Sequence, residues 1–250
     1  MFYFDYINNK KILRSDFLQE VNAFFTTKDI CICDKSDKNN PDISANKEII
    51  SNYLKINTED LISPEQTHSA NIKITKNNFS DYSDTDALIL TSFQKAIFLN
   101  FADCTPIIFY DKKQNIGAIT HAGWRGTAQK ISAKTAEKLR KDFNVNYEDL
   151  VVLIGPAICL DCYSVGEEVF EKLKSTVDDF SGLYKEKNNN RYVDLKNINK
   201  KQLTELGINN IDICPYCTCC DNQYFYSYRK ENGTLLRHSA VLCLENYEEK

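Results

Sequence analysis

Short apolar runs separated by polar turns make up most of the first half of this 250-residue chain. A run of four to eight apolar residues bounded by turn residues is typical of a buried strand. A charged stretch from Asp34 to Asn40 is expected to form a loop before Pro41. The pattern predicts strands, in chain order, at 2–4, 24–27, 71–75, 86–91, 96–101, 106–111 and 115–120.

Apolar residues at helical spacing occur in only a few segments of the chain. Apolar residues recur at the 3.6-residue spacing at 46–53 and 128–143, where Ile131 and Leu139 lie on one face. Gly207 follows a further helix as a C-terminal glycine commonly does. The remaining patterns predict helices at 166–174 and 197–206, and strands at 150–156, 211–213, 225–228 and 239–244. No repeat or linker interrupts them, so we expect residues 1–250 to form one domain.

Composition narrows the class of protein. The net charge of −4 gives no electrostatic footprint for nucleic acid. No apolar run reaches the length of about 18 residues that a membrane span needs, and the N-terminus lacks signal-peptide features, so we expect a cytoplasmic location and no membrane partner. Ten cysteines in a chain of this size, without an export signal, indicate reduced thiols, some of them metal ligands.

The scarce residue types gather between Gly117 and Gly126. This stretch holds one of three histidines, the only tryptophan and three of the eight glycines. His121 stands at the end of the predicted strand 115–120, and the glycines after it are expected to let the backbone turn before a helix begins near Thr127. Strand ends that face a helix start often carry chemistry.

Three residues with metal-ligand chemistry border predicted strands: His68, Cys104 and His121. They stand 36 and 17 residues apart, which suits ligands that come from separate strands and leave a fourth position for water or substrate. One thiolate and two imidazoles favour zinc, with copper possible. Alternatively, Cys104 is a nucleophile with a histidine base and no metal, or these are ordinary buried cysteine and histidine residues. Spacing alone does not separate the three interpretations.

Several sequence blocks resemble, in order, those of the YfiH-type family. That family carries the older label multicopper polyphenol oxidoreductase (laccase domain) and is described as zinc-dependent purine nucleoside phosphorylase with adenosine deaminase activity. The blocks are Gln66 to Ala70, Asp86 to Leu88, Ala102 to Pro106, His121 to Gly126, Ile154 to Ile158, Tyr163 to Val169 and Tyr226 to Arg229.

This resemblance implies an α+β fold in which mixed β-sheets pack together with flanking helices. It implies that His68, Cys104 and His121 match the family's metal-binding residues. It further implies phosphorolysis of adenosine, inosine, guanosine and methylthioadenosine, and deamination of adenosine. The expected partners are therefore purine nucleosides and phosphate, and we expect a monomer or a weak homodimer.

Three further residues are assigned candidate roles in such a reaction. Asp103 is a candidate catalytic acid that moves a proton, or else a carboxylate that orients its loop. Arg125 is a candidate cation for phosphate, or else a surface arginine at a helix start. Gln66, two residues before His68 in an extended segment, is a candidate substrate contact or an ordinary loop glutamine.

The chain also departs from the family pattern. An Arg-Gly-Gly-type turn and an Asn-Leu-Gly stretch are replaced by Thr26 to Asp29 and Cys31 to Asp34, and a terminal Thr-Gly-Arg is replaced by Thr234 to Arg237, in which only Arg237 matches. His238 is expected to be a strand-edge residue.

Two cysteine pairs with metal-site spacing stand outside these blocks. Cys214 and Cys217 form a Cys-x-x-Cys pair, and Cys159 with Cys162 is the distant pair of like spacing. Together these four cysteines would make a second, four-cysteine zinc site.

The sequence leaves three further functions open. A copper-dependent polyphenol oxidoreductase would need more histidines than the three present. The sequence is also compatible with a metal-free cysteine hydrolase and with a non-catalytic, envelope- or division-associated binding protein.

Overall fold

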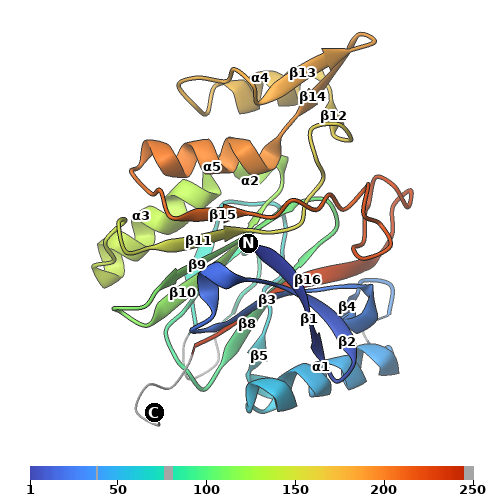
Figure 1. Cartoon of the computed structure of the whole chain (residues 1–250), viewed down its shortest axis with the longest axis vertical. Helices are drawn as coiled ribbons and strands as arrows, with labels where there is room; N and C mark the ends of the chain where they lie inside the picture. The colour runs from blue at the N-terminus through green and yellow to red at the C-terminus, as the bar shows by residue number, and fades with distance from the viewer. Residues whose placement is uncertain (38, 76–80, 245–250) are drawn as a thin grey trace.

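Two β-sheets lie face to face in the centre of the computed structural model, which describes residues 1–37, 39–75 and 81–244 (Figure 1). The seven-stranded sheet has the order β1-β2-β3-β16-β8-β5, with β4 paired to β16. The six-stranded sheet has the order β15-β11-β9-β10-β7-β6. The first contains β1 (Phe2–Ile7), β2 (Lys10–Ser15), β3 (Asn22–Thr26), β4 (Cys33–Asp34), β5 (Leu61–Ile62), β8 (Ala96–Phe101) and β16 (Leu236–Cys243). The second contains β6 (Ile72–Ile74), β7 (Ala87–Leu90), β9 (Thr105–Asp111), β10 (Ile116–Ala122), β11 (Val151–Ile154) and β15 (Ile211–Ile213).

Both sheets are mixed. The β5–β8, β6–β7 and β11–β15 pairs are parallel, whereas β9 pairs antiparallel with both β10 and β11. Strand β7 shows why the apolar runs are continuous. Leu88 and Leu90 pack between the two sheets, and Ala87 and Ile89 pack on the opposite face. A strand buried on both faces carries apolar side chains at every position.

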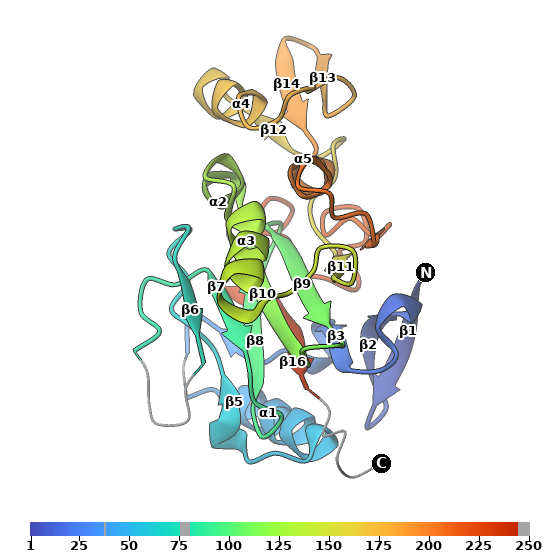
Figure 2. The same ribbon diagram turned by 90° about the vertical axis from the view of Figure 1, so that its left-hand side faces the viewer.

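Helices cover the outer faces of this double sheet. Helix α1 (Pro41–Leu54) lies on the seven-stranded sheet, and α3 (Ile131–Phe143) and α5 (Leu195–Glu205) lie on the six-stranded sheet (Figure 2). Helix α2 (Trp124–Ala128) follows β10 directly. Helix α4 (Glu167–Lys174) packs with a small sheet of β12 (Ser164–Val165), β13 (Tyr184–Lys187) and β14 (Asn190–Val193).

Short 3-10 turns complete the described elements, at Asp16–Leu18, Lys28–Ile30 and Thr58–Asp60. This arrangement confirms the α+β fold, with mixed sheets and flanking helices in a single domain. Within the described ranges, no helix combines the length and the apolar character that crossing a bilayer requires.

Two predicted helices have different bounds. The helix predicted at 46–53 begins at Pro41, because the Asn40 side chain accepts a hydrogen bond from the Asp42 amide and Pro41 occupies the first turn. The helix predicted at 128–143 is broken at Lys130, which has a φ of +57°. The residues before this break form α2, which starts at Trp124, immediately after Gly123, rather than near Thr127. The predicted loop 34–40 overlaps β4 only at Asp34, and its residue 38 lies outside the described residues.

The strand predicted at 225–228 is wrong. Phe225 and Tyr226 are buried and Tyr228 is exposed. The backbone bonds locally: the Phe225 amide donates to the Asp221 carbonyl, and the Ser227 amide donates to the Glu231 carboxylate. Burial of Phe225 therefore accompanies a turn, because the backbone is satisfied within the loop and pairs with no neighbouring strand.

His238 is also placed differently from the prediction. It lies inside β16, between β3 and β8, and is fully buried rather than at a sheet edge. Its ring contacts Phe101 and Phe225, and neither ring nitrogen has a well-formed hydrogen bond. Burial, which outweighs the nearby Pro156 carbonyl, lowers the pKa of His238 to about 3.

This buried imidazole predicts a specific loss of stability in acid. Below the ordinary histidine pKa of 6.5, the unfolded chain gains a proton at His238 that the folded chain takes up only near pH 3. The free energy of unfolding should therefore fall by about 1.4 kcal/mol per pH unit within this window, from His238 alone. Urea unfolding of His238→Leu between pH 8 and pH 4 should show a shallower decline than that of the unchanged protein. Parallel curves would show that His238 becomes protonated in the folded state.

Candidate metal centre

His68, Cys104 and His121 converge on one point where β9 begins and β10 ends. Their ligand atoms all lie within 4.8 Å of one another. Cys104 Sγ is 3.8 Å from His68 Nε2, and the two imidazole rings stand nearly edge to face with 4.8 Å between their centroids. His121 is buried, whereas His68 and Cys104 are partly exposed. The structure thus brings together the three residues that the sequence predicts as ligands.

Strand register explains the approach of Cys104 to His121. His121 pairs with Pro106, and Ala122 pairs with Thr105, in the antiparallel β9–β10 ladder. Cys104 immediately precedes β9, so it reaches the end of β10 where His121 stands. The turn that delivers Cys104 requires a left-handed backbone at Asp103, with a φ of +83°.

Asp86 connects His68, the third ligand residue, to the β9–β10 pair that carries Cys104 and His121. Its fully buried carboxylate lies 2.7 Å from His121 Nδ1 and accepts backbone hydrogen bonds from Thr67, His68 and Ser69. These bonds hold the His68 loop, in which His68 itself has a φ of +64°. A carboxylate that accepts from one imidazole nitrogen orients the ring and leaves the other nitrogen available to a metal.

The charges of these groups are strongly coupled. Burial opposes ionisation of the Cys104 thiol, but the neighbouring His121 and His68 outweigh burial and lower the Cys104 pKa to about 6. Burial likewise opposes protonation of His121, yet Cys104 and Asp86 raise the His121 pKa to about 9. Against its own burial, the His121 hydrogen bond lowers the Asp86 pKa to about 2. The centre therefore favours the thiolate form of Cys104, which a divalent cation would also stabilise, whereas binding of that cation requires His121 in its neutral form.

Gly123 leaves the space in which the ligand side chains meet. A Cβ at this position would lie 2.9 Å from Cys104 Sγ and 3.0 Å from His68 Cδ2. The φ of Gly123 is −69°, so glycine is needed here for space and not for an unusual backbone conformation. One thiolate, two imidazoles and a carboxylate behind one of them form a donor set that fits zinc.

A cavity of about 480 Å³ opens over the three ligand residues. All six predicted site residues line it, including Asp103, Arg125 and Gln66. Positive charge dominates the rest of its wall, which carries Lys35, Arg229 and Arg237 besides Arg125. A pocket with clustered guanidinium groups suits an anionic substrate such as phosphate.

The cationic residues differ in how firmly they are held. The Arg125 side chain is exposed, lies 4.4 Å from the centroid of the Trp124 ring, and makes no hydrogen bond or ion pair with the described residues. In contrast, Arg229 donates to the Ser164 hydroxyl and carbonyl, and Arg237 donates to the Thr234 and Leu236 carbonyls. Arg125 is therefore more available to a ligand than Arg229 or Arg237.

Asp103 and Gln66 have protein partners already. The Asp103 carboxylate accepts from the Thr218 hydroxyl at 2.6 Å and from the Arg229 amide at 2.7 Å. The Gln66 amide group exchanges two hydrogen bonds with the Asn100 backbone, at 2.8 and 2.9 Å. Both residues thus fix the cavity wall, and their catalytic and substrate-binding roles stay predictions.

The sequence pattern did not identify Asp86 as part of this site. Its position before a buried apolar strand, beside a histidine-bearing strand in space, is visible only once β7 and β10 are paired. Tyr163 carried no functional signal of its own either, although it lines the cavity against Arg229. Neither of the divergent stretches within residues 26–34 lines the cavity, although the next residue, Lys35, does.

Comparison with known proteins gives a consistent result. A family model described as multi-copper polyphenol oxidoreductase laccase matches residues 28–245. A protein of Bacteroides thetaiotaomicron named purine nucleoside phosphorylase is 32% identical over 69% of this chain and 68% of its own length. A protein named adenosine deaminase RL5, from an unknown prokaryotic organism, is 29% identical over 71% of this chain and 72% of its own length. The crystal structure of YlmD from Geobacillus stearothermophilus superposes with a TM-score of 0.88 and 26% identity, covering 97% of this chain and 99% of that one.

Proposed function

This chain belongs to the multi-copper polyphenol oxidoreductase laccase family, and from that membership we propose that it is a zinc-dependent purine nucleoside phosphorylase with adenosine deaminase activity. The relatives named purine nucleoside phosphorylase and adenosine deaminase support an enzyme that processes nucleosides. The proposed substrates are adenosine, inosine, guanosine and methylthioadenosine.

One observation carries the proposal. The His68, Cys104 and His121 donors lie in the wall of the same cavity as the unpaired Arg125 guanidinium. Phosphorolysis needs a site for phosphate beside the sugar, and deamination needs an activated water beside the base. A cavity that combines a zinc-type donor set with an available cation offers both on one wall.

The residues around the cavity would have separate roles in the two reactions. Zinc, when bound by His68, Cys104 and His121, supplies Lewis acidity. Arg125 binds a phosphate oxygen, so that the nucleophile is held next to the anomeric carbon whose bond to the base breaks. Asp103, if it exchanges one of its two protein partners, moves a proton to the leaving base or to the released amine.

A true multicopper oxidase is not supported by the chain. Such an enzyme assembles a blue-copper site and a trinuclear cluster from many histidines, and only three are present. His238 is buried within β16 and does not line the cavity, which leaves two histidines for this centre.

A metal-free cysteine hydrolase remains the rival mechanism. The 3.8 Å approach of Cys104 Sγ to His68 Nε2, with the Cys104 pKa lowered to about 6, also suits a thiolate nucleophile. Metal analysis of protein purified without chelator, followed by an assay after the metal has been stripped, separates the two mechanisms. The rival requires full turnover in the stripped protein.

The direct test is incubation of zinc-loaded protein with adenosine and phosphate, followed by chromatography of the purines. We expect adenine from phosphorolysis and inosine from deamination, with His68→Ala as the inactive control. Product levels equal to those of His68→Ala would contradict the proposal.

Arg125→Ala serves as the second variant. It should raise the KM for phosphate by about tenfold, the loss of one charge-assisted contact, while deamination without phosphate changes little.

A further inference from the structure

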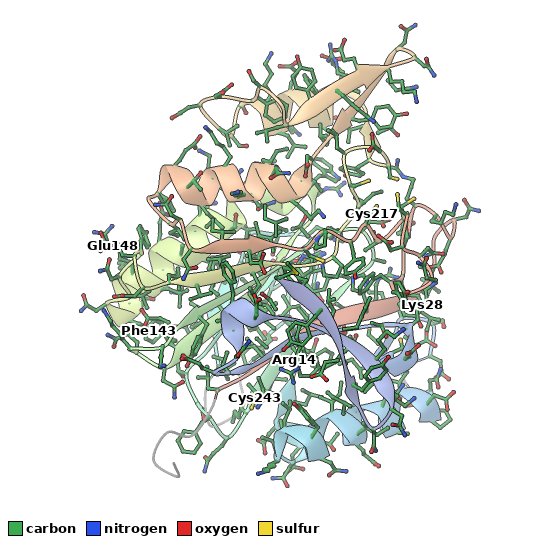
Figure 3. The ribbon with its side chains drawn as sticks, viewed as in Figure 1. Arg14, Lys28, Phe143, Glu148, Cys217 and Cys243 are labelled. Carbon is green, nitrogen blue, oxygen red and sulfur yellow. The ribbon has the colours of Figure 1, made fainter. Side chains whose placement is uncertain are left out.

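Four cysteines outside the cavity converge on a second point. Cys159, Cys162, Cys217 and Cys220 place all their sulfur atoms within 4.8 Å of one another. The chain supplies them as two Cys-x-x-Cys pairs, one before β12 and one after β15. Figure 3 labels Cys217, the buried member of the group.

This set corrects the pairing expected from the sequence. Cys214 and Cys217 form one Cys-x-x-Cys pair, and Cys217 and Cys220 form another. The sequence therefore allows either Cys214 or Cys220 to be the partner of Cys217 in a metal site. Cys214 follows β15 directly, and its side chain is fully buried in the core between the sheets. It is therefore turned away from the cluster, and Cys220 takes its place.

The geometry of the cluster matches that of a structural metal site. Zinc bound to sulfur at about 2.3 Å in a tetrahedron sets the ligands about 3.8 Å apart. Cys162 Sγ and Cys220 Sγ are 3.5 Å apart. Backbone amides of Cys159 and Cys220 donate to Cys217 Sγ at 3.3 and 3.4 Å. Amide hydrogen bonds of this kind stabilise a thiolate, which is the form that binds zinc.

We propose that Cys159, Cys162, Cys217 and Cys220 bind a structural zinc ion, separate from the His68, Cys104 and His121 centre. The ion joins two segments that are already adjacent, since Ala157 and Cys217 form a parallel bridge and the Thr218 amide donates to the Ala157 carbonyl.

The joined segments continue into the wall of the cavity. The first segment leads to Tyr163 and the second leads to Arg229, and both residues line the cavity. Arg229 also donates to the Cys162 carbonyl and to Ser164, so its guanidinium lies beside the cluster and partly offsets the charge of four thiolates. The proposed zinc thereby fixes the part of the wall that carries Tyr163 and Arg229.

A Cys162–Cys220 disulfide is the competing use of the same sulfur atoms. A disulfide would involve two of the four cysteines and leave no role for the hydrogen bonds that Cys217 Sγ accepts. Convergence of all four sulfur atoms favours a metal ion, and the disulfide is an outcome that the experiment detects.

The test is the zinc content of the full chain, measured by plasma mass spectrometry after expression with added zinc and purification without chelator. The unchanged protein should hold about two zinc ions per chain, and His68→Ala should keep about one. Cys220→Ser should lose one equivalent and melt about 5 °C or more below the unchanged protein. Because Cys220 is exposed, its replacement removes a ligand without opening a cavity in the core.

Two further variants tie the lost zinc to the Cys220 ligand itself. Cys219→Ser, at the neighbouring cysteine outside the cluster, should keep both equivalents. Cys220→His should restore the equivalent that Cys220→Ser loses, because three cysteines and a histidine also bind zinc. The proposal fails if His68→Ala holds no zinc, or if mass spectrometry of the unchanged protein finds Cys162 and Cys220 oxidised to a disulfide.

Discussion

Replacing Gly123 by alanine is expected to weaken zinc binding strongly at the His68, Cys104 and His121 centre while the protein stays folded. The added methyl group would lie 2.9 Å from Cys104 Sγ, closer than a Cβ normally comes to any atom, and 3.0 Å from His68 Cδ2, tighter than most Cβ contacts. Either ligand must then move, so zinc affinity should fall by about 100-fold or more and nucleoside turnover with it.

Gly166 provides a matched control for this change. Both glycines precede a helix with an extended backbone: φ is −69° and ψ is 176° at Gly123, and φ is −77° and ψ is 168° at Gly166. No atom lies within 4 Å of a Cβ built on Gly166. Competition titration against a chromophoric chelator should give unchanged zinc affinity for Gly166→Ala. Equal affinities for both alanine variants would show that the ligands do not need the space at Gly123.

Replacing Asp86 by asparagine is expected to weaken both the centre and the fold. The carboxylate is fully buried and accepts hydrogen bonds from the Thr67, His68 and Ser69 amides while it holds His121 Nδ1. In asparagine, an NH2 group replaces one of the two carboxylate oxygens. A hydrogen-bond donor then faces the backbone amides, which are donors themselves. We expect the unfolding free energy of the metal-free protein to fall by about 3–5 kcal/mol. Zinc affinity should fall by about 10–100-fold, because His121 loses its orienting partner.

Asp84→Asn is the control for Asp86→Asn. Asp84 belongs to the same loop, and its side chain bonds Thr67 and Asn71 at the surface rather than in the core. Urea unfolding should place this variant within about 1 kcal/mol of the unchanged protein. If Asp84→Asn and Asp86→Asn lose similar stability, the buried network is not what holds the His68 loop.

The strands were predictable because burial on both faces leaves a simple pattern. The run 96–101 coincides with β8, and the run 211–213 coincides with β15. The same criterion failed at 225–228, where Phe225 and Tyr226 are buried in a turn. Hydrophobic patterning reports burial, and it reports a strand only when a partner strand accepts the backbone hydrogen bonds.

The site residues of scarce types could be predicted from the sequence, whereas those of common types could not. Two of only three histidines and one cysteine, each bordering a predicted strand, pointed to one centre, and the structure brings them together. A carboxylate such as Asp86 is too common a feature to stand out without the β7–β10 pairing. The second cluster shows the limit of spacing, since Cys217 pairs equally well by sequence with Cys214 or Cys220, and burial of Cys214 decides between them.

The left-handed backbone of His68 has a consequence for the kinetics of metal exchange. His121 belongs to a seven-residue strand that pairs on both sides, so its ring is in place before any ion arrives. His68 stands in a loop outside any strand, with a φ of +64°, and depends on Asp86 for its position. We therefore expect an ion to enter between Cys104 and His121 first and to be closed in by His68, so that opening of the His68 loop sets the rate of its release.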